Sequence, residues 1–577
     1  MINIKSDIIK DSIGKLANNV RAENIDYENY LELYSGEENI RNVNNINNSI
    51  IYGRRGSGKT HLLKALQEKI NTSFSEERRY APYIDLRRII PILPSENMPP
   101  EARAILIFKY IIQELSHQIL QNVSAFHGLN EFDNNQHTIQ EDKKNRTIGL
   151  FKKVYLEFDG ERFSKPSTLT VAAEEVNSIS ATASLSAKPE LSGKIANQKK
   201  ITKTQTETTY ISILDITNVL EEILTELNIN RIIILLDEWS EIDFDVQIHL
   251  AEVIKKSFSA IPISIKISAI PNRTNLGIKK DQKFYGLEDG GDIFSYPLDM
   301  RYVFEVNKNQ TRDFFNDMLY RHLKSINAAS IDELLKSEKT TKGKLINTFF
   351  ANVALNEILI ACAGVPRDFI NLFLNSYDRF ILTSNSSNTR VSVKNVRSAN
   401  SAWYETDKKE QVNKHHIEKQ LLESIVQEII EKKKSIHFLI PDKYTSNKHI
   451  QNLIDFRVLH LRKSGYSHKD HPGVSYNVYS IDYGCYNSLN INKNSLDSST
   501  LDTLGIKELR DIRRVSLEDS FFQKFLLSIG EAFNCPHCTR AVDTNHLAFL
   551  KQNLCNNCYE RIDDELIPKT SQAKIAV

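Results

Sequence analysis

Apolar and polar positions along the first half of the chain predict alternating strands and helices. Ile50–Tyr52 is a short β-type run, and an amphipathic helical segment begins near Lys59. Arg231–Asp237 holds five consecutive apolar residues, which is typical of a strand buried on both faces. Tyr80–Arg88 is expected to form a further strand and Pro100–Val123 a long amphipathic helix. These elements predict an α/β core with parallel strands.

A helical region is expected to follow this core. Ile263–Ile270 alternates as a strand does, and Arg301–Val306 is expected to be the last core strand. Asn309–Lys324 and Lys342–Tyr377 then show helical periodicity. One face of the first helix is apolar and is expected to be core rather than a ligand site; its residues are Phe314, Phe315, Met318 and Leu319.

The C-terminal half shows a different order of elements. A helix (His416–Glu431), a strand (Ile436–Ile440) and a helix starting at Ser446 precede two alternating strands. Those strands, Val458–Ser464 and Ser475–Tyr483, flank a turn with Pro-Gly and predict a hairpin. This order resembles a winged helix.

Length and composition indicate a multidomain globular protein. The chain has 577 residues, of which 41% are hydrophobic and 25% charged, with a formal net charge of +1. Such a composition excludes global disorder, and any nucleic-acid contact must come from a local basic patch. Met1–Leu16 spreads charges through what would be the apolar part of a signal peptide, and no stretch is apolar enough to span a membrane. We expect a cytoplasmic protein without a membrane partner.

The segment after the first strand carries a phosphate-binding motif. Gly53 to Thr60 reads G-x-x-x-x-G-K-T between a strand and a helix. Glycines let backbone N–H groups approach phosphate oxygens, and the helix N-terminus adds its positive dipole. Lys59 is expected to reach the β- and γ-phosphates and the Thr60 hydroxyl to bind Mg²⁺. The predicted nucleotide-binding residues are Gly53, Arg54, Arg55, Gly56, Ser57, Gly58, Lys59, Thr60, His61 and Asp237.

An acidic pair ends the buried strand. Ligands bind at the carboxyl ends of parallel strands, where Asp237 is expected on the Mg²⁺ side. Glu238 is placed to act as the general base that polarises the attacking water. Alone, such a pair is more often an exposed strand end; with the phosphate motif, it predicts hydrolysis as well as binding.

These motifs resemble those of AAA+ ATPases, most closely the initiator clade of origin-recognition-type proteins. The resemblance implies that Asn272, or as second choice Ser268, is the first sensor after the strand Ile263–Ile270. It also implies that Arg367, in Ala363-Gly364-Val365-Pro366-Arg367, is a second sensor that touches the γ-phosphate. A trans-acting arginine finger is expected at Arg273 or Arg301.

The resemblance gives a domain plan for the whole chain. We expect an AAA+ core over 1–307, a helical lid and linker over 308–410, a winged-helix domain over 411–500 and a C-terminal region over 501–577. Far more residues separate Lys59 from Asp237 than a crossover needs, so an insertion is expected at about 128–210. Within it, Leu169–Ile195 and the lysine-rich Lys194–Lys203 form either a projecting hairpin that contacts DNA, substrate or a subunit, or a solvated insertion.

Basic residues gather in the winged-helix segment. They are Lys448 and His449 on the candidate recognition helix and Arg457, Arg462, Lys463, His468 and Lys469 around the wing. In initiators such a domain binds duplex DNA, and these side chains would neutralise phosphates. The alternative is a winged helix used for protein interaction.

Two C-x-x-C pairs lie near the C-terminus. Cys535, Cys538, Cys555 and Cys558 have the C-x₂-C-x₁₅₋₂₀-C-x₂-C spacing of a structural zinc site. Four thiolates close a tetrahedral shell, so a zinc ribbon over 533–562 is predicted, in preference to a redox dithiol. Its metal would stabilise a module too small to bury a core of its own.

Three functions are compatible with these features. In the first, ATP with Mg²⁺ switches an AAA+ protein that assembles as a homo-oligomer and binds double-stranded DNA. In the second, the protein is an anti-phage defence or signalling ATPase whose oligomer recruits an effector protein. In the third, it is a scaffold that binds ATP without hydrolysing it.

Overall fold

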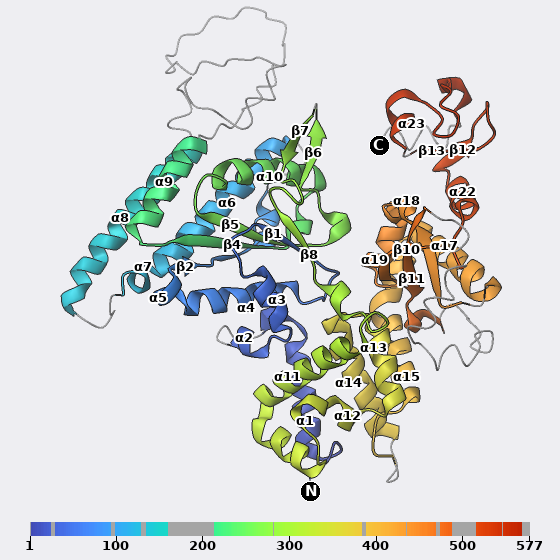
Figure 1. Cartoon of the computed structure of the whole chain (residues 1–577), viewed down its shortest axis with the longest axis horizontal. Coiled ribbons are helices and arrows are strands. Elements are labelled where there is room, and N and C mark those ends of the chain that lie inside the picture. Colours follow the sequence, from blue (N-terminus) through green and yellow to red (C-terminus); the bar gives the residue numbers. More distant parts are fainter. Residues whose placement is uncertain are drawn as a thin grey trace, which may run out of the picture. The chain divides into compact units, whose positions relative to one another are not determined.

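Figure 1 shows a computed structural model of the chain. The structure describes residues 2–24, 29–93, 98–128, 134–159, 213–280, 282–383, 388–433, 435–468, 473–486, 515–544 and 546–567. The chain divides into two compact units. The first unit comprises Met1–Val20 with Met300–Val577, and the second comprises Arg21–Asp299.

The second unit is built on a parallel sheet with the strand order β2-β4-β5-β1-β8, in which β3 also pairs with β4. All strand pairs of this sheet are parallel, as predicted. The strands are β1 (Ser49–Tyr52), β2 (Arg79–Tyr80), β3 (Tyr83–Asp85), β4 (Arg231–Asp237), β5 (Ile263–Ala269) and β8 (Phe294–Pro297).

Helices cover both faces of this sheet because its central strands are apolar on both sides. Ile232, Ile234 and Leu236 of β4 pack into one core with α6 (Pro100–Gln121), α9 (Ile213–Glu226) and α10 (Phe244–Phe258). Ile233 and Leu235 pack on the opposite face against α2 (Tyr30–Leu33), α3 (Glu37–Val43) and α4 (Lys59–Thr72). The fold is an α/β three-layer core.

Two of the predicted strands differ from the structure. The strand predicted at Tyr80–Arg88 is instead the end of β2, the strand β3 and the 3-10 helix Leu86–Arg88. Pro82, which has no N–H to donate to a ladder, lies between the two strands. The strand predicted at Arg301–Val306 is wrong, because β8 pairs with β1 at that edge of the sheet instead. A 3-10 helix (Asp299–Tyr302) leads out of the sheet there, and Tyr302 and Phe304 are buried in the core of the first unit.

Part of the predicted insertion is helical. Helix α8 (Asn134–Asp159) runs beside α9 (Figure 1), and ion pairs join Lys143 to Glu226 and Lys153 to Glu222. The segments Leu169–Ile195 and Lys194–Lys203 lie outside the described residues. A second addition is the hairpin of β6 (Gly277–Lys280) and β7 (Lys283–Gly286), which packs on α10.

The first unit begins with a helical subdomain, as the periodicity predicts. Its apolar core is shared by α1 (Asp7–Leu16), α11 (Lys308–Ser337), α13 (Asn352–Ala361), α14 (Pro366–Thr383) and α15 (Val393–Trp403). Phe315, Met318 and Leu319 are buried there, and Phe314 stacks on Tyr302 with ring centroids 3.7 Å apart. The prediction that these side chains are core is confirmed.

A small antiparallel sheet with the order β10-β11-β9 forms the next part of the first unit. The elements are α17 (His416–Ile425), β9 (His437–Pro441), α18 (Asp442–Thr445), α19 (Lys448–Asp455), β10 (Leu459–Ser467) and β11 (Ser475–Ile481). The predicted hairpin is confirmed by the antiparallel pairing of β10 with β11, although residues 469–472 of its turn lie outside the described residues. Helix α22 (Asp519–Ser528), strands β12 (Ala532–Asn534) and β13 (Ala541–Asp543) and helix α23 (Leu547–Gln552) follow.

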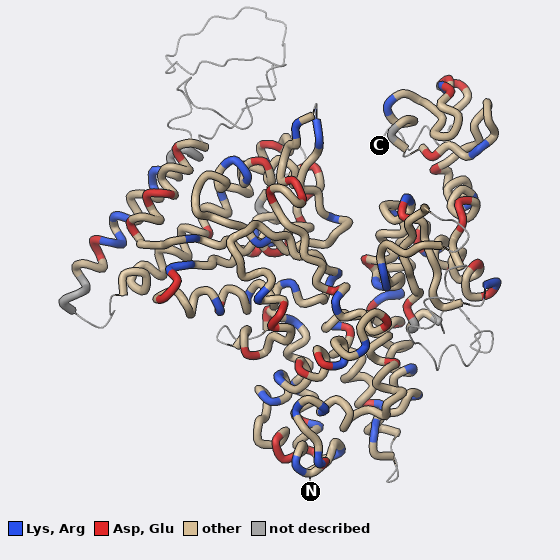
Figure 2. The backbone as a smooth tube through the Cα atoms, in the orientation of Figure 1, with Lys and Arg blue, Asp and Glu red and all other residues tan. Residues whose placement is uncertain are grey.

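Charge is mixed along the chain. Figure 2 shows Lys and Arg interspersed with Asp and Glu in both units, in keeping with a net charge of +1. Within the described ranges, no helix combines the length and the apolar character that a membrane crossing requires.

Candidate functional site

The phosphate-binding loop connects β1 to α4 and depends on its glycines. Gly56 and Gly58 adopt left-handed backbone angles, with φ of 84° and 90°. A Cβ added at Gly53 would lie 2.4 Å from the Ser57 hydroxyl. Side chains at these positions would therefore strain the backbone or displace the loop.

Lysine and serine side chains of the loop fit a phosphate group. The Lys59 ammonium donates hydrogen bonds to the carbonyls of Gly53 (2.7 Å) and Arg54 (3.2 Å), so the loop wraps around it. The Ser57 hydroxyl is buried and has no hydrogen-bond partner among the described residues. Together with the N-terminus of α4, a cation and an unsatisfied hydroxyl at this loop suit an anionic ligand.

The two arginines of the motif, and His61 just beyond it, bind other residues of the second unit. Arg54 is buried and binds Asp299 through both its backbone N–H (3.1 Å) and its Nε (2.6 Å). Arg55 pairs with Glu241 at 2.8 Å. The Nε2–H of His61 donates to the Tyr30 carbonyl (2.9 Å), and burial lowers the pKa of His61 to about 4, so the ring is neutral at physiological pH. Arg54 and Arg55 thus anchor the loop through their side chains.

Asp237 is a fully buried carboxylate at the carboxyl end of β4. Its oxygens accept hydrogen bonds from the Tyr83 hydroxyl (2.7 Å), the Ser268 hydroxyl and the Glu238 N–H (3.0 Å). Burial, and next the Asp237 charge, raise the pKa of Tyr83, which therefore stays a donor. Three donors orient the carboxylate, as an Mg²⁺ ligand requires.

Glu238 lies one residue beyond the strand in a left-handed conformation, with φ of 61°. Burial is the largest influence on this carboxyl and raises its pKa, and the Asp237 charge adds to the effect. The charges of Lys59 and Arg87 lower the pKa, and the Arg87 guanidinium lies 3.8 Å from the carboxylate. The phosphate loop and the acidic pair therefore act on one site, and a raised pKa suits a general base.

The two candidates for the first sensor occupy different surroundings. Ser268 of β5 is buried and hydrogen-bonded to Asp237. Asn272 is exposed in the 3-10 helix Pro271–Arg273 that follows β5. Arg273 ends that helix in the second unit. Ser268 is thus the sensor candidate that contacts the acidic pair.

Arg301 and Arg367 belong to the first unit. Arg301 lies in the 3-10 helix Asp299–Tyr302, which leads away from β8. Arg367 is in the first turn of α14, after a turn in which Ala363 and Gly364 have φ of 50° and 79°. The roles of both arginines toward a nucleotide stay predictions.

Most basic residues predicted to form a DNA-binding surface are buried instead. Arg457, Arg462, His449 and His468 are each at most 8% exposed. His449 lies between Glu418 (2.9 Å) and Glu531 (3.2 Å). Their assignment to the surface is wrong, because periodicity predicts the strand or helix but not which other element covers it.

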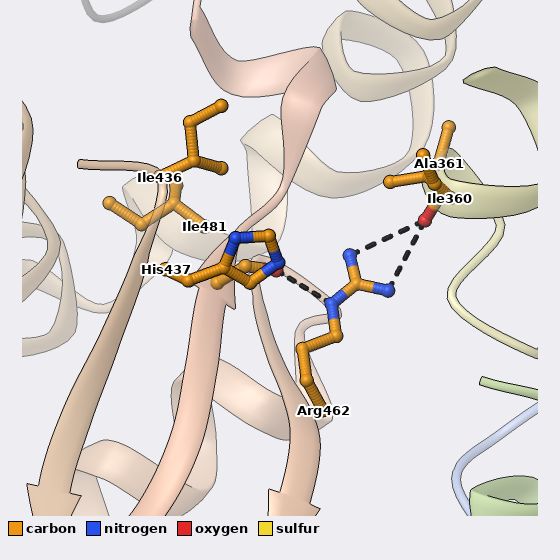
Figure 3. Close-up of a pocket in the computed structure, with 7 residues that line it drawn as sticks. Ile360, Ala361, Ile436, His437, Arg462 and Ile481 are labelled. Carbon is orange, nitrogen blue, oxygen red and sulfur yellow. Dashed lines mark hydrogen bonds between the residues drawn. The ribbon is translucent and has the colours of Figure 1, made fainter. Parts of the chain in front are cut away.

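Arg462 shows this clearly (Figure 3). Its guanidinium donates to the Ile360 carbonyl through both terminal nitrogens, at 3.3 Å each, and to the Ser480 hydroxyl at 2.7 Å. Of the remaining predicted residues, Lys448 pairs with Glu531 at 2.8 Å, Lys463 is exposed and Lys469 lies outside the described residues.

The four predicted zinc ligands come together. The sulfur atoms of Cys535, Cys538, Cys555 and Cys558 all lie within 4.8 Å of one another. Backbone N–H groups of His537 and Asn557 each donate to a cysteine sulfur at 3.4 Å, and Thr539 and Tyr559 turn the chain with φ of 59° and 60°. His537 points to the Arg561 carbonyl (3.2 Å) rather than joining the set. Four thiolates at this spacing fit a tetrahedral zinc ion.

Comparisons with known proteins identify the family. A family model described as ORC-CDC6-like matches residues 16–351, more than half of the chain. The solved structure of the Aeropyrum pernix ORC1 protein in complex with DNA aligns with 86% of this chain and 97% of that chain, at 11% identity and a TM-score of 0.27. No curated protein matches the sequence. The chain belongs to the ORC-CDC6-like family, a group of AAA+ ATPases.

Proposed function

We propose that this protein binds ATP with Mg²⁺ and hydrolyses it. The proposal rests on the proximity of the loop around Lys59 to the acidic pair. The Lys59 charge acts on Glu238, whose pKa is raised by burial, and Asp237 beside it is fully buried. Thr60 and Asp237 would hold the metal ion, which supplies charge neutralisation to the β- and γ-phosphates. Lys59 would bind phosphate oxygens after leaving the Gly53 and Arg54 carbonyls.

Glu238 is the residue that would take a proton from the attacking water. Ser268 and Tyr83 support this step by holding the neighbouring Asp237 in place. Arg367 would contact the γ-phosphate from α14 and report the nucleotide state. Arg273 or Arg301 would act on the active site of a neighbouring subunit, so a homo-oligomer is part of the proposal.

The remaining parts fit the predicted domain plan. The order α17, β9, α18, α19, β10, β11, with β9 pairing β11, supports a winged helix over 411–500. The cysteine cluster, with one pair after β12 and the other after α23, supports a zinc ribbon over 533–562. Membership of an initiator-like family supports double-stranded DNA as a ligand of the whole protein.

The second candidate function is favoured by one specific observation. Arg457, Arg462 and His449 are buried in contacts within the first unit, which removes three of the basic groups predicted for the winged-helix surface. A winged helix whose predicted phosphate-binding side chains are engaged internally suits a protein partner better than a phosphate backbone. This favours the defence or signalling ATPase that recruits an effector protein.

Two sets of lysines separate these candidates. Lys463 is the exposed basic residue of β10, whereas Lys279, Lys280 and Lys283 are exposed on the β6–β7 hairpin of the ATPase core. We expect duplex DNA affinity to fall steeply with salt and to drop in the triple alanine variant of the hairpin more than in Lys463→Ala. DNA affinity that ignores salt, or no affinity, would leave the effector-recruiting function.

Hydrolysis is tested with a pair of variants. Glu238→Gln should bind ATP and retain it unhydrolysed, because the amide cannot accept the proton of water. Lys59→Ala should lose both binding and turnover. Turnover by Glu238→Gln at the wild-type rate would refute the assigned base.

A further inference from the structure

The turn that precedes Arg367 contains a strained position, and its conformation depends on contacts with neighbouring elements. It runs from the end of α13 at Ala361 to the start of α14 at Pro366. Ala363 is a non-glycine residue with φ of 50°, a conformation that a side chain disfavours. Surrounding contacts must therefore fix the direction in which Arg367 leaves the turn.

Arg462 of β10 holds the N-terminal side of this turn. Both terminal nitrogens of its guanidinium donate to the Ile360 carbonyl, one of the last carbonyls of α13 (Figure 3). An ion pair with Glu305 at 3.3 Å and a hydrogen bond to Ser480 satisfy the rest of the group, which is 3% exposed. A rigid, fully engaged guanidinium thus links β10 to the end of α13.

Arg457 holds the other side of the turn. It lies between α19 and β10, with φ of 59°, and its two terminal nitrogens bind the carboxylates of Asp368 and Asp407. Asp368 is 1% exposed and directly follows Arg367 in α14. Breaking a buried pair of this kind leaves an uncompensated charge, so the connection is strong.

We propose that Arg457 and Arg462 are positioning residues for Arg367. They clamp the turn from both sides through Asp368 and the Ile360 carbonyl, so the winged-helix part and the second sensor move as one body. A partner or ligand that shifts the winged-helix part then changes ATP turnover, and nucleotide binding at Arg367 shifts the winged-helix part. The inference rests on the proposed ATPase function.

A double-mutant cycle in the full-length protein tests the proposal. Arg367→Ala, Arg457→Ala and the double variant are compared for kcat and KM of ATP hydrolysis. A displaced catalytic or sensing group costs on the order of tenfold to a hundredfold in rate, so Arg457→Ala should lower kcat by that factor. In the background of Arg367→Ala, the same change should have no further effect, because the group that it positions is gone. Arg457→Lys should fall in between, since a single ammonium cannot bind both carboxylates as the fork does.

A matched control separates positioning from general destabilisation. Arg397 of α15 also pairs with a carboxylate of α13, but that carboxylate belongs to Glu357, before the turn that leads to Arg367. Arg397→Ala should leave kcat unchanged while lowering the melting temperature by about as much as Arg457→Ala does. Effects of Arg457→Ala and Arg367→Ala that multiply, or an equal loss of kcat in Arg397→Ala, would overturn the proposal. Absence of ATP turnover in the wild type would instead refute the proposed function, and the cycle would then be read on ATP affinity.

Discussion

Arg87 is one of the charges that lower the pKa of Glu238, the proposed general base, and its removal gives a quantitative prediction. The Arg87 guanidinium lies 3.8 Å from the Glu238 carboxylate and is 40% exposed. Because it is partly solvated, we use the dielectric of water, which gives about 1 kcal/mol for this pair. Arg87 lowers the pKa of Glu238 against burial and Asp237, which raise it. In Arg87→Ala the pKa therefore rises further.

The consequence is visible in the pH dependence of hydrolysis. A general base works when ionised, so the rate falls as pH drops through the raised pKa of Glu238, and this acidic limb should move to higher pH in Arg87→Ala. On the limb, about 1 kcal/mol corresponds to about a fivefold lower ionised fraction and rate. The assay is kcat for ATP hydrolysis across pH at saturating Mg²⁺ and ATP.

Arg88 provides the control for this experiment. It is the next residue, is exposed, and makes no ion pair with Glu238 in the described part of the chain. Arg88→Ala should keep the wild-type profile. An unchanged profile in Arg87→Ala, or the same displacement in both variants, would refute the reasoning.

Three further predictions concern groups outside this pair. Tyr83→Phe removes a donor from the buried Asp237 and should cost about 1.5–3 kcal/mol, seen as faster hydrogen exchange in β4; wild-type protection would contradict it. Cys538→Ser should abolish binding of one zinc ion per chain, measured by native mass spectrometry; zinc retained at full occupancy would argue against the tetrahedral site. Burial lowers the pKa of Lys266 from 10.5 to about 7, so the unfolded chain binds more protons between these pH values and wild-type stability should rise with pH there. Lys266→Met should lack this rise, and parallel melting curves against pH would exclude the shift.

Local sequence patterns were sufficient to predict the glycine loop between β1 and α4, the strand β4 and the acidic pair at its end. Each of these is a short continuous segment whose periodicity and motif spacing do not depend on distant contacts. The cysteine cluster is predictable for the same reason, since ligand spacing is written in the sequence. These elements were placed correctly.

Long-range contacts explain what the sequence did not reveal. Arg462 and Arg457 lie on elements that were predicted, but their burial depends on α13, α14 and Asp407, which are distant in sequence. Tyr83 reaches Asp237 only through the parallel pairing of β3 with β4. In that pairing Asp85 lies opposite Asp237, and Tyr83 lies two residues before Asp85 on the same face of β3. This spacing is the sequence feature from which the Tyr83–Asp237 contact could have been predicted. The strand predicted at Arg301–Val306 was wrong because the chain leaves the sheet after β8 in a 3-10 helix, at whose first residue, Asp299, the carboxylate binds the distant Arg54.

Calorimetric titration with ATP tests the central claim most directly. The account predicts saturable ATP binding by the wild-type protein that strengthens with Mg²⁺. Lys59→Ala should abolish it, and Asp237→Asn should remove only the dependence on Mg²⁺. No heat of binding with ATP, or equal affinity in Lys59→Ala, would contradict a triphosphate held between the glycine loop and the end of β4.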